Sequence, residues 1–502
     1  MNWLQWLAAR PRLGDLLALA AGALLPLAFA PFEWRLLSVL SPALLFLLWL
    51  QISPRRAFWR GYLFGLGQFG VGVSWVYNSI HLFGNAVAPL AGLFTALFIA
   101  VLALYPAIIG SLMVRLGRRF SLGAAALLVA LPFGWVLHEW VRGWLFTGFP
   151  WLLLGHPQVD SWLMGYVPVL GAYGASLVAA LLAAGLAGVL VLPGRRRWLA
   201  GGGVAALVLG GLLLAALSWT RPVGETLSVS IVQPSIAQED KWRREQFQPT
   251  LEIYEKLTRA HFGRDVIVWP ESAIPATFGQ VAADYLRPLA ADAHAHGTAL
   301  VTGIFVRDPQ DGTYYNSLVV LDGEIDVYHK RHLVPFGEYT PLRGLLGWLD
   351  RFVVIPMSDL GTGTGRPLLQ VNGHPVGASI CYEDAFGEEV IEALPEAAYL
   401  INVSNDAWFG DSLAPWQHLE LARMRALESG RWMVRATNTG VSAVIDARGR
   451  LVAVSPQFER HVLNAEIQPY EGMTPYARWG NWPVVGLAVL VLGLLAALRW
   501  RR

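Results

Sequence analysis

Cysteine, lysine and charge are scarce in this sequence, and each shortage excludes some classes of protein. The single cysteine, Cys381, cannot form a disulfide within the chain, so it serves packing, metal binding or reaction. Charged residues make up 15% of the 502 residues, against about 25% in soluble domains, which indicates a protein at least half embedded in a membrane. The net charge of +2 is too small to indicate a nucleic-acid partner. Among 38 basic residues only Lys241, Lys256 and Lys330 are lysine, so each is either a chance survivor or a candidate for chemistry that arginine cannot perform.

The first 220 residues are almost continuously apolar and predict an α-helical membrane domain. Apolar stretches near the ~20 residues that a bilayer requires are separated by short arginine clusters. We predict eight transmembrane helices, seven in residues 1–219 and the eighth in residues 481–502, where a short basic tail follows it. The predicted spans are 13–31, 36–52, 60–80, 87–114, 122–141, 161–192, 199–219 and 482–498.

Arginine clusters occur at every second boundary between these spans, starting before the first and ending after the eighth. Because basic loops stay in the cytoplasm, both termini are expected there, and residues 220–480 are expected on the opposite side. Within the membrane half, Glu139 and Arg142 have the i, i+3 spacing of a helix. A mutual salt bridge is the plain explanation for this pair, although ionisable residues in a membrane are often functional.

Residues 220–480 have the alternating pattern of an α/β domain. Strand-like apolar runs such as 227–232 and 399–403 alternate with helical stretches such as 239–261 and 416–429. This alternation predicts a layered sheet covered by helices, and the segment is long enough to enclose one core.

Three segments of this domain place an ionisable side chain just after a strand-like run. VIVWPESAIP presents Glu271, IDVYHKRHLVPFGEY presents Lys330 and Glu338, and GASICYED presents Cys381. Active sites of α/β sheets collect at the carboxyl ends of strands, so these side chains can converge. A carboxylate that deprotonates a thiol and an ammonium that stabilises an oxyanion together support acyl transfer through a thioester. Taken singly, each residue has an ordinary explanation: Cys381 can be a small buried hydrophobe, the glutamates can be loop carboxylates, and Lys330 can be part of a solvated basic turn. Taken together, these residues favour a catalytic site.

The same segments resemble a known family. WPES, KRHLVPFGEY and ICYED are similar to the Glu-Lys-Cys motifs of the nitrilase superfamily. The chain as a whole, with its predicted spans, resembles the bacterial apolipoprotein N-acyltransferase family over essentially its full length. The resemblance implies a four-layer αββα nitrilase-like sandwich for 220–480, on the periplasmic side of the bacterial inner membrane, with both termini cytoplasmic. The further motifs that carry it are SNDAWFG (404–410), PWQH (415–418), ARMRALE (422–428), TNTG (437–440) and TPYAR (474–478).

The resemblance also implies roles for individual residues. Glu271 resembles the general base, Lys330 the oxyanion-stabilising lysine and Cys381 the nucleophile, while Glu338 matches the second essential glutamate of the family. No metal and no cofactor are implied. The remaining matches, to supporting or substrate-binding positions, are Tyr382, Glu383, Asn316, Trp242 and Trp408.

The implied reaction moves an acyl chain from a membrane phospholipid to Cys381, and then to the N-terminal α-amine of the S-diacylglyceryl-cysteine of an apolipoprotein, which completes lipoprotein maturation. The expected partners are therefore a phospholipid donor, a diacylated apolipoprotein acceptor and membrane lipids, and a monomer is expected. One alternative is a membrane-tethered carbon–nitrogen hydrolase with the same triad. Another is a transporter or scaffold with an inactive soluble domain, against which the intact set of Glu271, Lys330 and Cys381 argues.

Overall fold

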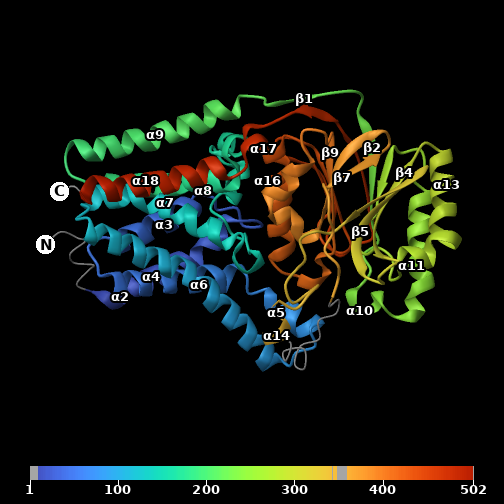
Figure 1. The fold of residues 1–502 in the computed structure, drawn as a ribbon, viewed down its shortest axis with the longest axis horizontal. Helices are drawn as coiled ribbons and strands as arrows, with labels where there is room; N and C mark the ends of the chain where they lie inside the picture. The colour runs from blue at the N-terminus through green and yellow to red at the C-terminus, as the bar shows by residue number, and fades with distance from the viewer. Residues whose placement is uncertain (1–9, 342, 347–358, 501–502) are drawn as a thin grey trace. The chain divides into compact units, whose positions relative to one another are not determined.

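The computed structural model describes residues 10–341, 343–346 and 359–500, and it divides into two compact units (Figure 1). Arg501 and Arg502 of the predicted basic tail lie outside the described residues. The helical unit comprises Met1–Tyr77, Ala88–Ser218 and Arg478–Arg502, and the α/β unit comprises Trp219–Ala477 with the short segment Asn78–Val87.

In the helical unit, a helix lies at each of the eight predicted spans. Proline occupies the first turn of α2, α4 and α8, where its missing N–H is not needed. By length and composition, five helical stretches of the described chain can cross a membrane, and α3 and α18 are shorter apolar helices. The unit therefore contains several candidate membrane spans. The helices are α2 (Pro11–Leu24), α3 (Leu37–Trp49), α4 (Pro54–Gly72), α5 (Val76–Asn78), α6 (Ala88–Arg119), α7 (Ala124–Arg142), α8 (Val167–Val191), α9 (Arg195–Ala215) and α18 (Trp482–Trp500).

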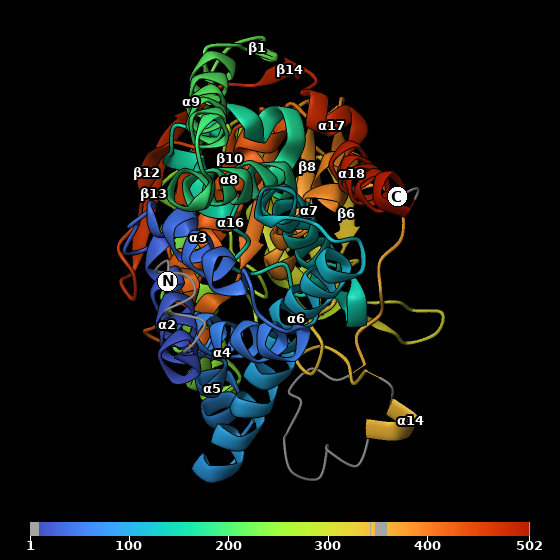
Figure 2. The same ribbon diagram turned by 90° about the vertical axis from the view of Figure 1, so that its left-hand side faces the viewer.

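Glycines allow the first of these helices to pack closely. A Cβ at Gly22 of α2 would lie 1.9 Å from the carbonyl oxygen of Phe64 in α4, and a Cβ at Gly61 of α4 would lie 2.4 Å from that of Pro106 in α6. Small residues at such contacts are typical of helix pairs in membranes. Both Figure 1 and Figure 2 show α2, α4 and α6 side by side.

Glu139 and Arg142, at the end of α7, both bind the segment that follows this helix. Glu139 Oε1 accepts hydrogen bonds from the indole N–H of Trp135 at 2.9 Å and from the backbone N–H of Leu154 at 3.1 Å. Arg142 donates to the carbonyl oxygen of Trp151 at 2.5 Å. These contacts give both side chains a structural role, and their mutual salt bridge stays a prediction.

The α/β unit is built on two six-stranded sheets. The first has the order β13-β2-β3-β4-β5-β6 and the second β12-β11-β10-β9-β8-β7. Each sheet contains three consecutive parallel strands, which are β2, β3 and β4 in the first sheet and β8, β9 and β10 in the second. The strands are β1 (Thr220–Pro222), β2 (Leu227–Gln233), β3 (Val266–Val268), β4 (Ala299–Arg307), β5 (Tyr314–Asp322), β6 (Glu324–His329), β7 (Leu368–Val371), β8 (His374–Ile380), β9 (Tyr399–Ser404), β10 (Met433–Thr437), β11 (Ala443–Ile445), β12 (Leu451–Val454), β13 (His461–Ile467) and β14 (Tyr470–Gly472).

Helices cover the outer faces of both sheets. Figure 1 shows α16, then the two sheets, then α11 and α13. Between the sheets lies a core of buried side chains that includes Val268, Val301, Ile380 and Val403. This arrangement confirms the predicted layered α/β architecture. The helices of the unit are α10 (Gln238–Lys241), α11 (Arg244–Arg259), α12 (Phe278–Val281), α13 (Arg287–Ala295), α14 (Arg343–Leu346), α15 (Gly387–Val390), α16 (Ala414–Ser429) and α17 (Pro475–Trp479), which extends two residues beyond it.

Segment 78–87 was expected to be the end of a span and the loop after it, but it belongs to the α/β unit. Ser79–Phe83 form a π-helical turn. Asn78 donates to the carbonyl oxygen of Phe409 at 3.0 Å, and Ser79 donates to that of Trp408 at 2.9 Å. The rings of Phe83 and Trp408 meet edge-on with centroids 5.2 Å apart. A short piece of the first half of the chain is thereby attached to the loop that follows β9.

Candidate active site

Cys381 comes directly after β8, where the chain turns into the 3₁₀ turn η8 (Cys381–Ala385). Its φ of 52° lies in the left-handed region, which is costly for a residue with a Cβ. The residue is only 8% exposed. Such a conformation persists because the surrounding structure holds it, so the contacts of this turn determine where the thiol lies.

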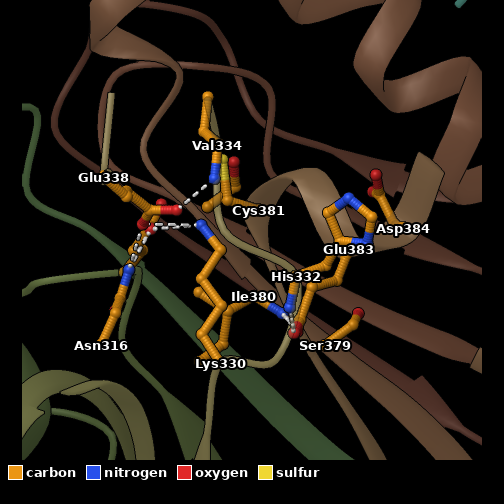
Figure 3. Close-up of polar contacts among 12 residues, drawn as sticks. Asn316, Lys330, His332, Val334, Glu338, Ser379, Ile380, Cys381, Glu383 and Asp384 are labelled. Atoms are coloured by element: carbon orange, nitrogen blue, oxygen red, sulfur yellow. Dashed lines mark hydrogen bonds and ion pairs between the residues drawn. The ribbon is translucent and has the colours of Figure 1, made fainter. Parts of the chain in front are cut away.

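The carboxylates and the ammonium come from the other sheet. Glu271 follows β3, Asn316 lies on β5, and Lys330 directly follows β6. Lys330 Nζ lies 2.8 Å from Glu338 Oε1 and 3.7 Å from Glu271 Oε1. The amide of Asn316 donates to Glu271 at 2.7 Å and to Glu338 at 3.1 Å (Figure 3). One ammonium and one amide therefore hold two buried carboxylates in place.

Gly303 on β4 makes room for the turn that presents Glu271. A Cβ at this position would lie 2.6 Å from Glu271 Cα and 2.6 Å from the carbonyl oxygen of Pro270, closer than any side chain tolerates. The carbonyl oxygen of Gly303 accepts a hydrogen bond from Ala273 N–H at 2.7 Å. This glycine thus fixes the path of the turn.

The charges around Cys381 set the protonation of the site. Burial raises the pKa of the Cys381 thiol well above its usual value, the charge of Glu271 raises it further, and Lys330 opposes both effects. Burial disfavours the Lys330 ammonium, but Glu338 and Glu271 outweigh burial and raise the pKa of Lys330. The resting site therefore holds a neutral thiol beside a permanent ammonium. A nucleophilic reaction at this thiol would require its deprotonation, and Glu271 is a neighbouring carboxylate that can accept the proton.

Glu383 ties two loops of the site together. Burial raises the pKa of Glu383, and Lys330 and the N–H groups that it accepts from offset part of that rise. Figure 3 shows its carboxylate next to His332 and Ile380. Its two oxygens accept four hydrogen bonds, from Tyr328 Oη (2.9 Å), Arg331 N (2.6 Å), His332 N (3.1 Å) and Ile380 N (2.7 Å).

The three aromatic residues predicted for the site have different surroundings. Tyr382 packs edge-on against Phe386, with ring centroids 5.1 Å apart. Trp242 is 48% exposed, and its ring centroid lies 6.1 Å from that of Phe305. Trp408 contacts segment 78–87. The contact of the two tryptophans with substrate stays a prediction.

The structure also contains a buried ionic cluster next to Cys381 that the sequence patterns did not single out. It consists of Asp384, Asp406, His418 and Arg435, all buried. The available signal was that three of them occur in motifs that carried the family resemblance: ICYED, SNDAWFG and PWQH.

The α/β unit resembles a known class of enzyme domain. The α/β unit matches the carbon–nitrogen hydrolase family over residues 228–476, so this part of the chain is a nitrilase-like domain. The crystal structure of Saccharomyces cerevisiae Nit3, a member of branch 10 of the nitrilase superfamily, is similar to this chain at 21% identity and a TM-score of 0.38, covering 50% of this chain and 93% of Nit3.

The helical unit and the whole-length relatives give the family. Residues 21–185 match the apolipoprotein N-acyltransferase N-terminal domain. The apolipoprotein N-acyltransferase of Methylococcus capsulatus is 49% identical over 488 residues, which cover 97% of this chain and 96% of that protein. That of Coxiella burnetii is 42% identical over 487 residues, covering 96% and 99%. The chain belongs to the apolipoprotein N-acyltransferase family, and the resemblance predicted from its motifs is confirmed.

Proposed function

We propose that the protein transfers an acyl chain from a membrane phospholipid, through a thioester on Cys381, to the N-terminal α-amine of the S-diacylglyceryl-cysteine of an apolipoprotein. The observation that carries this proposal is that the only cysteine of the chain interacts electrostatically with both Glu271 and Lys330 at the strand end of a nitrilase-like sandwich. Membership of the acyltransferase family supports the choice of acceptor.

In the first half-reaction, Glu271 accepts the thiol proton of Cys381, and the thiolate attacks the ester carbonyl of the phospholipid. The negative charge that develops on the carbonyl oxygen is stabilised by the ammonium of Lys330, which Glu338 and Asn316 keep in position. The carbon–oxygen bond to the glycerol breaks, and the leaving alkoxide takes the proton from Glu271. The products are a lysophospholipid and a thioester on Cys381.

In the second half-reaction, the neutral α-amine of the acceptor attacks the thioester carbonyl. Lys330 again stabilises the oxyanion, and Glu271 accepts a proton from the attacking nitrogen. The carbon–sulfur bond breaks, the sulfur of Cys381 recovers the proton, and the acyl chain remains on the acceptor as an amide. We assign the half-exposed Trp242 and the loop residue Trp408 to contacts with the lipid chains.

The membrane arrangement is part of the proposal. Eight helices span the bilayer, residues 1–219 forming seven and residues 481–502 the eighth with its basic tail, and both termini lie in the cytoplasm. Residues 220–480 form the catalytic domain on the periplasmic side of the bacterial inner membrane, and the protein acts as a monomer. The alternating arginine clusters support the orientation. Both substrates carry acyl chains, which a catalytic domain at the bilayer surface meets directly.

The test uses the purified protein in phospholipid vesicles with a diacylated lipopeptide, and mass spectrometry to detect triacylated product. Phospholipid alone is expected to leave one acyl adduct on the peptide containing Cys381, and Cys381→Ala is expected to give neither adduct nor product. Absence of the adduct in the wild type contradicts the thioester mechanism. Release of free fatty acid with unmodified lipopeptide identifies a carbon–nitrogen-hydrolase-like enzyme in which water is the acceptor.

A further inference from the structure

The ionic cluster behind the turn of Cys381 is built from residues that the proposed reaction does not use. Asp384 belongs to η8, Asp406 to the 3₁₀ turn η10 (Asp406–Phe409), His418 to α16 and Arg435 to β10. None of the four is more than 1% exposed. Burial of so many charged groups is costly unless they are paired and hydrogen-bonded, so their arrangement around the nucleophile calls for an explanation.

The contacts of His418 fix its charge. Nδ1 lies 2.7 Å from Asp406 Oδ1, and Nε2 lies 3.0 Å from Asp384 Oδ1 and 3.2 Å from the carbonyl oxygen of Cys381. Carboxylate and carbonyl oxygens only accept hydrogen bonds, so both ring nitrogens must donate, which only an imidazolium can do. In agreement, Asp384 and Asp406 outweigh burial and the charge of Arg435 and raise the pKa of His418 to about 9.

Arg435 completes the pairing. It donates to the second oxygen of Asp384 at 2.9 Å and to the second oxygen of Asp406 at 3.1 Å. Two cations therefore balance two anions, and every carboxylate oxygen has a donor. Ser404 donates to Asp406 at 2.9 Å and also interacts with the thiol of Cys381. The cluster thus reaches the nucleophile at both its backbone carbonyl and its side chain.

We propose that His418 is a positioning residue for the nucleophile: its imidazolium holds the carbonyl group of Cys381 and thereby keeps the thiol oriented towards Glu271 and Lys330. This role rests on the proposed function of the same site. The left-handed φ of Cys381 needs restraint from outside. On the N-terminal side of Cys381, Glu383 restrains the backbone by accepting a hydrogen bond from Ile380 N–H. On the C-terminal side, His418 restrains it by donating to the carbonyl oxygen of Cys381.

The test compares wild type, His418→Gln and the double variant His418→Gln/Asp406→Asn. The single variant leaves an unbalanced buried anion and risks misfolding. The double variant restores charge balance and still lacks the imidazolium, so it tests positioning with the fold preserved. His296→Gln is the matched control, because His296 is exposed on the far side of the chain's first sheet, at the end of α13. Thermal unfolding and circular dichroism establish which variants are folded.

Two quantities are measured on each folded variant. The rate constant of single-turnover thioester formation is expected to fall about tenfold or more, with the phospholipid concentration that gives half of the maximal rate unchanged. The pH midpoint for alkylation of Cys381 by iodoacetamide is expected to differ by about one unit or more from that of Asp406→Asn alone, because a displaced thiol changes its distances to Glu271 and Lys330, whose charges act on its pKa. Asp406→Asn is the reference because the charge of Asp406 also raises the pKa of this thiol. Cys381 is the only cysteine, so alkylation reports on it alone.

A wild-type rate of thioester formation, or an unshifted alkylation midpoint, in the folded double variant overturns the positioning role. Alkylation requires no lipid, so a shifted midpoint supports this role even if the wild type were found to transfer no acyl chain. Failure of the acyl-transfer proposal and failure of the positioning proposal are therefore separate results.

Discussion

Replacement of Glu383 by glutamine tests how the two loops of the active site are held together. Glutamine keeps the size and shape of the side chain but exchanges one oxygen for an NH₂ group. In its better orientation the amide oxygen still faces the hydroxyl of Tyr328 and the N–H groups of Arg331 and His332, while the NH₂ group faces Ile380 N–H, a donor against a donor. The bond next to the nucleophile is therefore the one that is lost.

The magnitude follows from these contacts. A hydrogen bond to a charged group contributes about 1.5–3 kcal/mol, and an unsatisfied buried N–H costs about 1–3 kcal/mol. The two terms overlap, so we expect a total of about 2–4 kcal/mol. Ile380 directly precedes Cys381, so the lost hydrogen bond mainly destabilises the turn that positions the thiol. If this free energy adds fully to the activation free energy of thioester formation, the reaction slows roughly 30- to 1,000-fold.

The assay for Glu383→Gln is single-turnover thioester formation at saturating phospholipid, followed by mass spectrometry of the intact protein. Glu466→Gln is the control, because Glu466 is an exposed glutamate on β13. A Glu383→Gln enzyme with the wild-type rate and wild-type thermal midpoint would refute the view that this carboxylate holds the turn of Cys381.

Three other predictions concern charge and orientation. Lys330→Arg is expected to lower product formation about 100- to 1,000-fold, because the broad guanidinium cannot replace the compact ammonium between two carboxylates; near-normal turnover in the vesicle assay would contradict the oxyanion role. The pKa of His418 is raised in the fold from 6.5 to about 9, so its contribution to stability is complete below pH 6.5 and is lost as the pH rises through about 9. Thermal midpoints of the wild type should show this alkaline loss, and the charge-balanced double variant should show less of it; identical alkaline slopes would count against the ion pairs. Glu324 is exposed on β6, so a Glu324→Cys substitution in a Cys381→Ala background should react with a membrane-impermeant maleimide added to spheroplasts, and labelling only after lysis would reverse the proposed orientation.

The sequence was sufficient to predict where the two strand ends of the site lie. Val266–Val268 and His374–Ile380 lie in apolar runs that end within a few residues of an ionisable side chain, and this local pattern predicted Glu271 and Cys381 at the carboxyl ends of strands. Lys330 follows β6, which is antiparallel to its neighbour β5. The position of Lys330 depends instead on its ion pair with Glu338 and on the hydrogen bonds that Glu383 accepts from the backbone of Arg331 and His332. A strand pattern in the sequence does not predict these contacts.

Features that depend on distant partners could not be predicted. Arg435 interrupts the apolar pattern of β10, and the two aspartates with which it pairs lie 51 and 29 residues away in sequence. Segment 78–87 was assigned by hydropathy to a span and a loop, whereas its hydrogen-bond partners are 331 and 329 residues further along the chain. Periodicity reports which face of an element is apolar, but it carries no information on such pairings.

The division of the site between two sheets has a consequence for how the protein is made. Glu271 and Lys330 are attached to one sheet and Cys381 to the other, so neither sheet holds all three residues of the proposed triad. Under the proposed mechanism, Cys381 therefore lacks its base and its oxyanion-stabilising lysine until the two sheets pack together. We expect a newly made chain to be acylated on Cys381 only after folding is complete.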